Sequence, residues 1–203
     1  AITGKSIGNK KIAGDRKTPE GIYFATSQLD GKLLPSKYGP GAFTLDYPNV
    51  YDTLLRKTGN GIWIHGVQNN KRILTPFDTE GCVALKNSDW LDLKQYISLE
   101  ETPVIITEEV SYFDSLSELD EAKTSIAQYI NFWKTSWESS KFEDYADFYS
   151  PKFSAAGLDK NKWIKVKKNL AKERDMNLKI NISNLKSYSS GEQMIITFDQ
   201  DYV

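Results

Sequence analysis

Histidine and cysteine are almost missing from this sequence, because its 203 residues contain one of each. A single Cys excludes an internal disulfide, and one His with one Cys does not supply the ligands of a structural zinc site. Long apolar runs are missing too, and none approaches the roughly 18 residues that a membrane-spanning helix needs. The 26 basic and 27 acidic side chains give a net charge of -1, without the basic excess of a dedicated nucleic-acid binder. We therefore expect no cofactor, no metal, no nucleic-acid partner and no membrane span in this chain.

Glycine and proline are scarce in the second part of the chain. Residues 1–110 contain 11 of the 13 Gly and 6 of the 7 Pro, so that residues 111–203 keep only Gly157, Gly191 and Pro151. A chain of 203 residues is long enough for two small domains, each with its own core. The shift in composition predicts one domain over residues 1–110 and a second over residues 111–203.

The first part has the pattern of a β-rich domain, with short strands separated by turns. Residues 21–26, 61–65 and 103–107 are runs of β-branched and aromatic residues bounded by turn residues, which predicts three strands. The Asn, Ser and Asp at 87–89 favour a helix start, so we expect a helix through residues 90–96.

The second part changes to a helical pattern followed by two strands, which indicates a small α+β domain. Apolar side chains recur there at intervals of three or four residues, as on one face of a helix of roughly five turns. They are Leu119, Ala122, Ile126, Ile130, Trp133 and Trp137. Trp163, Val166 and Leu170 predict the buried face of a second helix, and residues 178–182 and 194–198 alternate as strands do.

Two groups of side chains in this second part allow more than one interpretation. Trp133, Trp137 and Trp163 could line a ligand pocket, but tryptophans at helical spacing favour a core. Basic side chains crowd residues 160–174 and could bind an anionic polymer, although lysines opposite an apolar stripe are typical of a solvated face. These residues are Lys160, Lys162, Lys165, Lys167, Lys168, Lys172 and Arg174.

The only His and the only Cys lie 17 positions apart, at His65 and Cys82, and each is next to a glycine. A Cys becomes a nucleophile when a nearby base, most often an imidazole, accepts the thiol proton. His65 ends an apolar run and is expected at a strand end, while Gly81 would let a substrate carbonyl approach main-chain N–H groups as in an oxyanion hole. The alternative is an inert buried Cys with a structural His, and the spacing alone does not decide between them.

Ordered motifs surround this pair between residues 3 and 107. They are Gly14-Asp15, Thr18-Pro19-Glu20-Gly21, Tyr38-Gly39, residues 42–49, residues 61–66, Thr79-x-Gly81-Cys82-Val83-x-Leu85 and Asn87-x-Asp89. The set closely resembles the L,D-transpeptidase (YkuD-type) catalytic domain. The resemblance implies a β-rich fold in which Cys82 is the nucleophile, His65 is its base and the backbone carbonyl of Gly66 orients the imidazole.

The same resemblance implies a substrate, the peptidoglycan tetrapeptide, in which the thiolate would attack the carbonyl of the meso-diaminopimelate–D-Ala bond. An acceptor amine would then give a 3–3 crosslink, and water would give a tripeptide. Family members commonly carry a His before the Gly-Cys pair and an Arg two positions after the Cys, where this sequence has Glu80 and Ala84. Loss of the Arg removes a fixed cation, so we expect hydrolysis rather than crosslinking.

Positions around the cysteine are expected to meet the substrate, namely Thr79, Glu80, Gly81 and Ala84. Glu80 would either face the free amino group of diaminopimelate or be an exposed loop carboxylate. Asn87 and Asp89 are expected to cap the helix that follows and to hold the cysteine loop, without touching substrate.

Three segments carry a second resemblance: residues 132–137, residues 144–153 and Trp163. They look like a nuclear transport factor 2-like domain, a small cone-shaped α+β fold. The order of the two domains is similar to that of the murein L,D-carboxypeptidases that set cell shape in helical bacteria, which implies a periplasmic or other cell-envelope location. The chain begins at Ala1 without a Met and stops in a strand-like stretch, so we expect the last strand of the cone and a preceding segment to be missing.

The sequence leaves three functions open. The first is a cysteine-dependent murein L,D-carboxypeptidase, which trims tetrapeptides to tripeptides. The second is an L,D-transpeptidase that forms 3–3 crosslinks. The third is a peptidoglycan-binding module with a vestigial site, against which the intact pair of Cys82 and His65 argues.

Overall fold

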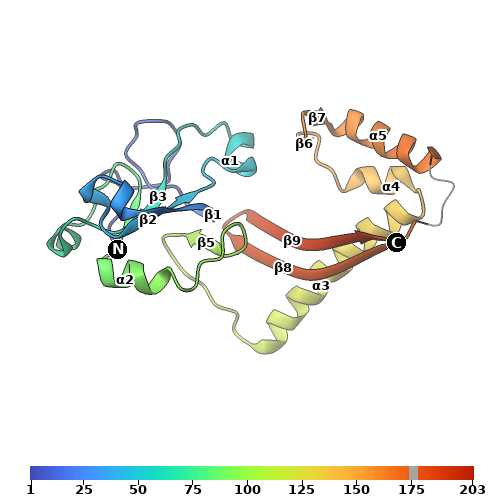
Figure 1. Cartoon of the computed structure of the whole chain (residues 1–203). Coiled ribbons are helices and arrows are strands. Elements are labelled where there is room, and N and C mark those ends of the chain that lie inside the picture. The colour runs from blue at the N-terminus through green and yellow to red at the C-terminus, as the bar shows by residue number, and fades with distance from the viewer. Residues whose placement is uncertain (174–177) are drawn as a thin grey trace. The chain divides into compact units, whose positions relative to one another are not determined.

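The computed structural model describes residues 1–173 and 178–203, and the chain forms two compact units (Figure 1). The first unit comprises Ala1–Val110 together with Tyr188–Met194. The second comprises Ser111–Ser187 and Ile195–Val203. The first is a curled β-rich sheet and the second is a small α+β domain, as the sequence predicts.

The first unit is built on a five-stranded sheet in the order β4-β3-β2-β1-β5. Its strands are β1 (Gly21–Asp30), β2 (Gly41–Leu45), β3 (Trp63–His65), β4 (Val83–Ala84) and β5 (Pro103–Ile106). Neighbouring strands are antiparallel except β3 and β4, which are parallel. The three strands predicted from the β-branched runs are confirmed as β1, β3 and β5, whereas β2 and the very short β4 were not predicted as strands.

The helices of the first unit are short. The α-helices are α1 (Val50–Leu54) and α2 (Asn87–Leu93), and three single turns of 3₁₀ helix are η1 (Gly31–Leu33), η2 (Ser36–Tyr38) and η3 (Asn70–Leu74). The N-cap residue of α2 is Lys86, and no side chain caps it. The predicted cap at Asn87 and Asp89 is therefore wrong, because the Asn87 side chain accepts a hydrogen bond from the distant N–H of Val67 instead.

One aromatic contact holds α2 against the sheet. The ring of Trp90 stacks on Phe43 of β2 with 5.4 Å between ring centroids, and its indole N–H donates to the Ile64 carbonyl at 3.3 Å. Both Trp90 and Phe43 are almost fully buried, so they form the centre of the core of this unit. This packing covers the sheet beside β3, the strand that ends in His65.

The first residues of the chain extend the sheet beyond β4. Ile2 and Ala84 exchange two backbone hydrogen bonds of 2.8 and 2.9 Å, and the Lys5 N–H donates to the Thr79 carbonyl at 2.8 Å. Gly4 also forms a bridge with Thr79. The segment that leads to Cys82 therefore has backbone partners on the side away from β3.

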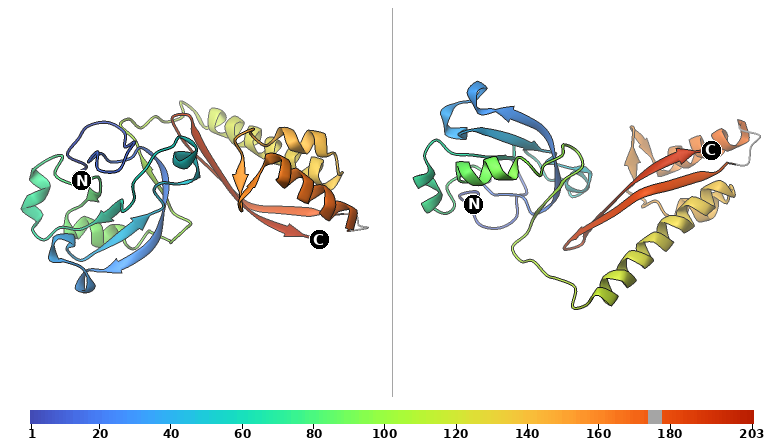
Figure 2. Two further views of the ribbon diagram at one scale, coloured as in Figure 1. Left: turned by 90° about the horizontal axis from the view of Figure 1, so that it is seen from above. Right: turned by 60° about the horizontal axis from the view of Figure 1, so that its bottom comes forward.

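Within the described residues, the second unit contains three α-helices, one short strand pair and most of a long strand pair, whose turn-side ends at Tyr188–Met194 belong to the first unit. They are α3 (Leu116–Glu138), α4 (Phe142–Asp147), α5 (Lys160–Glu173), the pair β6 (Ser154–Ala155) with β7 (Leu158–Asp159), and the pair β8 (Ile180–Ser190) with β9 (Gln193–Tyr202). The strands β8 and β9 run side by side in every view (Figures 1 and 2). The long helix, the helix at 160–173 and both final strands were predicted, whereas α4 and the β6–β7 pair were not.

The apolar stripe predicted for α3 is confirmed, since its six members are its partly or fully buried apolar residues, with Ile130 and Trp137 most enclosed. The predicted stripe of α5 is confirmed at Trp163 and wrong at Val166 and Leu170, which are 40% and 36% exposed while Ile164 is buried. The reason is that α5 presents Trp163 and Ile164 to the core, so the buried face is rotated toward that side.

The tryptophans of the second unit are core residues, as predicted. Trp137 is 4% exposed and lies 5.0 Å from the ring of Tyr145, and Trp133 and Trp163 pack against the same cluster. Lys167 departs from the expected solvated face, since its Nζ lies 4.5 Å from the ring centre of Trp137.

The other lysines predicted on the solvated face of α5 fit that expectation to different degrees. Lys162, Lys165 and Lys172 are exposed, in agreement with it. The Nζ of Lys168 lies 5.8 Å from the ring centre of Phe142, so this side chain also covers an aromatic ring. Arg174 lies outside the described residues.

Candidate active site

His65 is the last residue of β3 and is only 4% exposed. Its Nδ1 lies 2.5 Å from the carbonyl oxygen of Gly66. A carbonyl oxygen only accepts hydrogen bonds, so Nδ1 must carry the ring hydrogen in the neutral imidazole. This arrangement leaves Nε2 with a free lone pair, as a general base requires.

Cys82 directly precedes β4 and is half-buried. The parallel pairing of β3 with β4 places His65 opposite Ala84. Because side chains alternate between the two faces of a sheet, Cys82 lies on the same face as Ala84 and therefore as His65. The strand register thus brings the only thiol and the only imidazole of the chain to one face of the sheet.

The surroundings of the pair favour its uncharged form. Burial lowers the pKa of His65, and the nearby charges of Arg72 and Lys37 lower it further, against the opposing effect of the Gly66 hydrogen bond. Burial raises the pKa of the Cys82 thiol, partly offset by the backbone N–H of Trp63 and by the same two cations. At neutral pH the thiol and the imidazole are therefore both uncharged at rest, and the thiol donates to the Gly61 carbonyl at 3.4 Å.

The loop before Cys82 is closed by Thr79. The Thr79 hydroxyl donates to the Cys82 carbonyl at 2.7 Å and accepts from the Gly81 N–H at 3.1 Å. Gly81 has φ +126°, and a Cβ atom there would lie 2.7 Å from the Lys17 carbonyl oxygen, so only glycine fits. The structure thus places Thr79 and Gly81 in the support of the loop, and the Gly81 N–H is already used.

Glu80 and Ala84 are the two positions that depart from the family pattern, and neither supplies a cation to the site. The Glu80 carboxylate is 62% exposed and forms ion pairs with Lys5 at 2.7 Å and Arg16 at 3.1 Å. Its hydrogen bond from Lys5 lowers its pKa, so it is ionised at neutral pH. Ala84 is fully buried and packs with the core cluster at the sheet edge. Its side chain therefore contacts the protein interior.

Asn87 supports the backbone around the imidazole. Its Oδ1 accepts from the Val67 N–H at 2.8 Å, and a Cβ atom on Gly66 would lie only 2.7 Å from the same oxygen. Gly66 also packs against the Pro40 ring. The peptide that offers its carbonyl to His65 is therefore enclosed by two other segments. This contact with the segment after His65 was not predicted, because Asn before a helix favours a cap.

Two cations lie near the pair and were not predicted as site residues. Arg72 in η3 is tied to the loop before the cysteine, since its Nε donates to an Asp78 carboxylate oxygen at 2.8 Å and a guanidinium nitrogen donates to the Asp78 carbonyl at 2.7 Å. Lys37 places its Nζ 4.9 Å from the ring centre of Tyr38, and this ring touches the imidazole. Both cations lower the pKa of His65 and of Cys82, although Arg72 is also paired with the Asp78 carboxylate.

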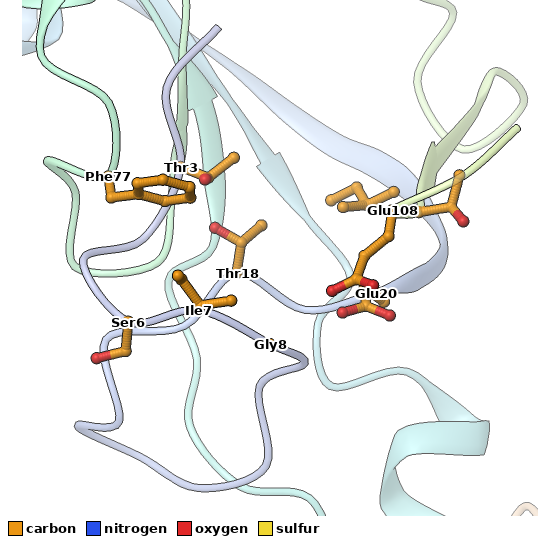
Figure 3. A pocket seen from close by; sticks show the side chains of 10 residues that line it. Thr3, Ser6, Ile7, Gly8, Thr18, Glu20, Phe77 and Glu108 are labelled. Atoms are coloured by element: carbon orange, nitrogen blue, oxygen red, sulfur yellow. The ribbon is translucent and has the colours of Figure 1, made fainter.

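A separate pocket of about 310 Å³ lies elsewhere in the first unit (Figure 3). Figure 3 shows the apolar side chains of Ile7 and Phe77 at one end and the carboxylates of Glu20 and Glu108 at the other. Neither Cys82 nor any residue around the imidazole lines it.

Within residues 1–173 and 178–203, no group of three or more His, Cys, Asp or Glu side chains is arranged to hold a metal ion. In the same part of the chain, no helix combines the length and the apolar character that crossing a membrane requires.

A curled sheet that carries a Cys and a His on one face is typical of the L,D-transpeptidase catalytic domain. Residues 1–106 match the model of the YkuD L,D-transpeptidase catalytic domain, and the chain belongs to this family. Residues 125–203 match the Cds6 C-terminal NTF2-like domain. Both resemblances seen in the sequence are confirmed.

Solved structures show the same combination along the whole chain. Bd1075 of Bdellovibrio bacteriovorus superposes with a TM-score of 0.82 at 35% identity, over 99% of this chain and 70% of that one. The K307A mutant of the helical cell shape determining protein Pgp2 of Campylobacter jejuni superposes with a TM-score of 0.72 at 31% identity. The match covers 100% of this chain and 69% of that one. A second Pgp2 structure superposes with a TM-score of 0.67 at 28% identity, over 99% of this chain and 75% of that one. A comparison with curated proteins finds no match.

Proposed function

We propose that this chain is a cysteine-dependent murein L,D-carboxypeptidase, with a catalytic domain over residues 1–110 and an NTF2-like domain over 111–203. It would cleave the meso-diaminopimelate–D-Ala bond of peptidoglycan tetrapeptides in the cell envelope, at a periplasmic location. One observation carries the proposal: the only thiol and the only imidazole lie on one face of the β3–β4 pair, with the imidazole Nδ1 held by a carbonyl.

In the proposed mechanism, His65 Nε2 takes the proton of the Cys82 thiol while the sulfur forms a bond to the substrate carbonyl carbon. The tetrahedral intermediate collapses, the carbon–nitrogen bond breaks, and the imidazolium gives its proton to the departing D-Ala amine. Water then attacks the thioacyl carbon as the imidazole removes its proton. The carbon–sulfur bond breaks, and the proton returns to the thiolate to regenerate the thiol.

One feature supports hydrolysis over crosslinking. Position 84 is occupied by a fully buried Ala, so it presents no cation to a donor or acceptor strand. The charges of Lys37 and Arg72 act on both Cys82 and His65. They favour a substrate with a carboxylate close to the scissile bond, which supports the acylation step that hydrolysis and crosslinking share. A terminal D-Ala has such a carboxylate. Pgp2, a structural relative, is itself a cell shape determining protein.

The deciding experiment incubates the purified chain with disaccharide tetrapeptide and separates the products by mass. We expect a tripeptide and free D-Ala, and we expect Cys82→Ala or Cys82→Ser to lower the rate at least about 10³-fold, since removal of a nucleophile removes the covalent route. Tyr96→Leu, at a 70% exposed position, is the matched control and should retain the full rate. Wild-type rates in Cys82→Ala would contradict the proposal.

The two other functions predict different outcomes in the same assay. An L,D-transpeptidase would convert added acceptor peptide into a 3–3 linked dimer. A binding module with a vestigial site would release no product and would not be acylated by a carbapenem, a reagent that reacts with the family's catalytic thiol. Mass spectrometry of the intact chain after carbapenem treatment separates this last case from an inactive preparation.

A further inference from the structure

An aromatic ring that the proposed mechanism does not use lies against the imidazole. Tyr38, the last residue of η2, places its ring 5.0 Å from that of His65 with an interplanar angle of 87°, an edge-to-face contact. The same ring lies 5.0 Å from the ring of Trp63 at 46°. Trp63 and His65 are two positions apart on β3 and share one face of the sheet, so Tyr38 spans both side chains.

The hydrogen bond to Gly66 restrains only one corner of the imidazole. It sets the tautomer and the position of Nδ1, but a small ring held at one atom can still tilt about that bond. A neighbouring ring in edge-to-face contact restrains this tilt, because the contact is favourable over a narrow range of angles. His65 is also only 4% exposed, and the partly buried Tyr38 is one of the side chains that shield it from water.

Tyr38 is itself held firmly by the chain around it. Gly39 follows it, and a Cβ atom there would lie 2.6 Å from the Val67 nitrogen, so the backbones of these two segments are in direct contact. Pro40 then packs against Gly66, the residue that anchors Nδ1. The backbone that carries Tyr38 is therefore packed against the peptide that holds the imidazole.

We propose that Tyr38 is a positioning residue for His65, whose ring, braced by Trp63, holds the imidazole with Nε2 toward Cys82 and keeps water from it. The aromatic ring carries this role and the phenol hydroxyl does not. The kinetic part of the inference rests on the proposed carboxypeptidase function. The structural part depends only on the imidazole.

The composition of the chain makes the test direct. His65 is the only histidine, so the imidazole signals in an NMR titration report this residue alone, and the only cysteine makes thiol alkylation equally specific. The charged groups that act on the imidazole are Lys37 and Arg72, and neither is replaced in the variants. Tyr38→Phe keeps the ring, Tyr38→Leu removes it, and Tyr96→Leu removes an exposed ring elsewhere.

Removal of the ring should let water reach the imidazole, so in Tyr38→Leu we expect the pKa of His65 to rise toward its ordinary value of about 6.5. The acid limb of the profile of kcat against pH should move by the same amount. We expect kcat for D-Ala release to fall at least about tenfold with KM changed less than about twofold, because a misplaced base affects the chemical step. Tyr38→Phe and Tyr96→Leu should behave as wild type in each measurement.

An unchanged His65 titration and pH profile in Tyr38→Leu would overturn the inference, as would a Tyr38→Phe variant that behaves like Tyr38→Leu. If circular dichroism shows that Tyr38→Leu does not fold, Tyr38→Met replaces it, since an unbranched side chain adapts to the same space. If the wild-type chain releases no D-Ala, the carboxypeptidase proposal fails. The NMR titration of the same variants then still decides whether Tyr38 positions the imidazole.

Discussion

At the scale of single residues, the arrangement of His65 and Cys82 differs from a preformed thiolate–imidazolium pair. Burial acts in opposite directions on the two groups, since it lowers the pKa of the imidazole and raises the pKa of the thiol. Transfer of a proton from sulfur to Nε2 is then unfavourable at rest and must be coupled to attack on the substrate. The nearby charges of Lys37 and Arg72 reduce the cost of the developing negative charge.

The pH dependence of the reaction should follow from the lowered pKa of His65 and the raised pKa of Cys82. The imidazole becomes able to accept a proton above its pKa, which lies below the ordinary value of about 6.5, so kcat/KM should rise with pH on the acid side and be level at neutral pH. Alkylation of Cys82 by iodoacetamide should rise only at alkaline pH, beyond the usual range of about 8.5 for a thiol. Fast alkylation at pH 6 would show an ion pair and contradict this picture.

The sequence predicts the candidate reactive residues of the site better than it predicts the residues that hold them in place. Cys82 and His65 are single occurrences within ordered motifs, so their neighbourhood could be read from the residues alone. The contact of Tyr38 with His65 and the hydrogen bond of Asn87 to Val67 join residues that are 27 and 20 positions apart. Such contacts depend on how the strands and loops pack, and local preferences, which favour a helix cap for Asn87, do not contain this information.

At the scale of elements, the loop around Asp15 shows how the glycine-aspartate motif stabilises the first unit. The Asp15 carboxylate accepts from Lys10 Nζ at 2.6 Å and from the backbone N–H groups of Lys11, Ile12 and Lys17. Its side chain is 11% exposed. Burial alone would raise the pKa of this carboxyl, but the four hydrogen bonds outweigh it and hold the pKa well below its usual range.

Asp15→Asn should therefore destabilise the first unit by about 3 kcal/mol at pH 7, because it leaves the buried Lys10 ammonium without its counter-charge. The contribution of a carboxyl with a depressed pKa is present above the pKa of the unfolded chain, about 3.9, and is lost as the pH falls further. The difference in urea unfolding between wild type and variant should thus begin to shrink below about pH 4 and continue to shrink down to pH 2, without vanishing there.

The control for this measurement is Asp92→Asn, at an exposed position of α2. It should change the free energy of unfolding by no more than about 0.5 kcal/mol at either pH. A difference between Asp15→Asn and wild type that stays constant from pH 7 to pH 2 would show that the charge of Asp15 is not the cause.

The helices and strands were predicted best where the buried apolar face extends over many residues. The stripe on α3 covers more than five turns and is confirmed, because errors at one position do not move the average face. On the 14-residue α5 the true face includes Ile164 and the Lys167 stem, which covers tryptophan rings, and a pattern that counts lysine as solvated places part of the stripe wrongly. The two-residue strands β6 and β7 are too short to show alternation.

At the scale of the whole molecule, the described residues form two main hydrophobic cores besides the small cluster of Ile2, Val67 and Ala84. One is centred on Tyr23, Phe43 and Trp90 in the first unit, and the other on Trp137 and Tyr145 in the second. The residues packed against Trp137 all belong to the second unit. A loss of packing there should therefore act on the second unit and leave the chemistry of the first intact.

Trp137→Ala should lower the stability of the second unit by about 3–5 kcal/mol, since it removes a large buried side chain and leaves a cavity. We expect the imidazole signals of His65 and the acylation of Cys82 by a carbapenem to remain at wild-type values below the unfolding transition. Thermal unfolding followed by circular dichroism measures the first effect, with Tyr112→Ala at an 86% exposed position as control. Loss of acylation in folded Trp137→Ala would show that the units are energetically coupled.

The pairing of Ile2 with Ala84 has a consequence for association between molecules. Without it, the short strand β4 would end the sheet with unpaired backbone N–H and C=O groups, and such an edge is a template on which strands of other chains assemble. Residues 2–5 occupy this template and bind the segment that leads to Cys82. The same few residues that support the cysteine loop should thus also oppose association of chains through this edge of the sheet.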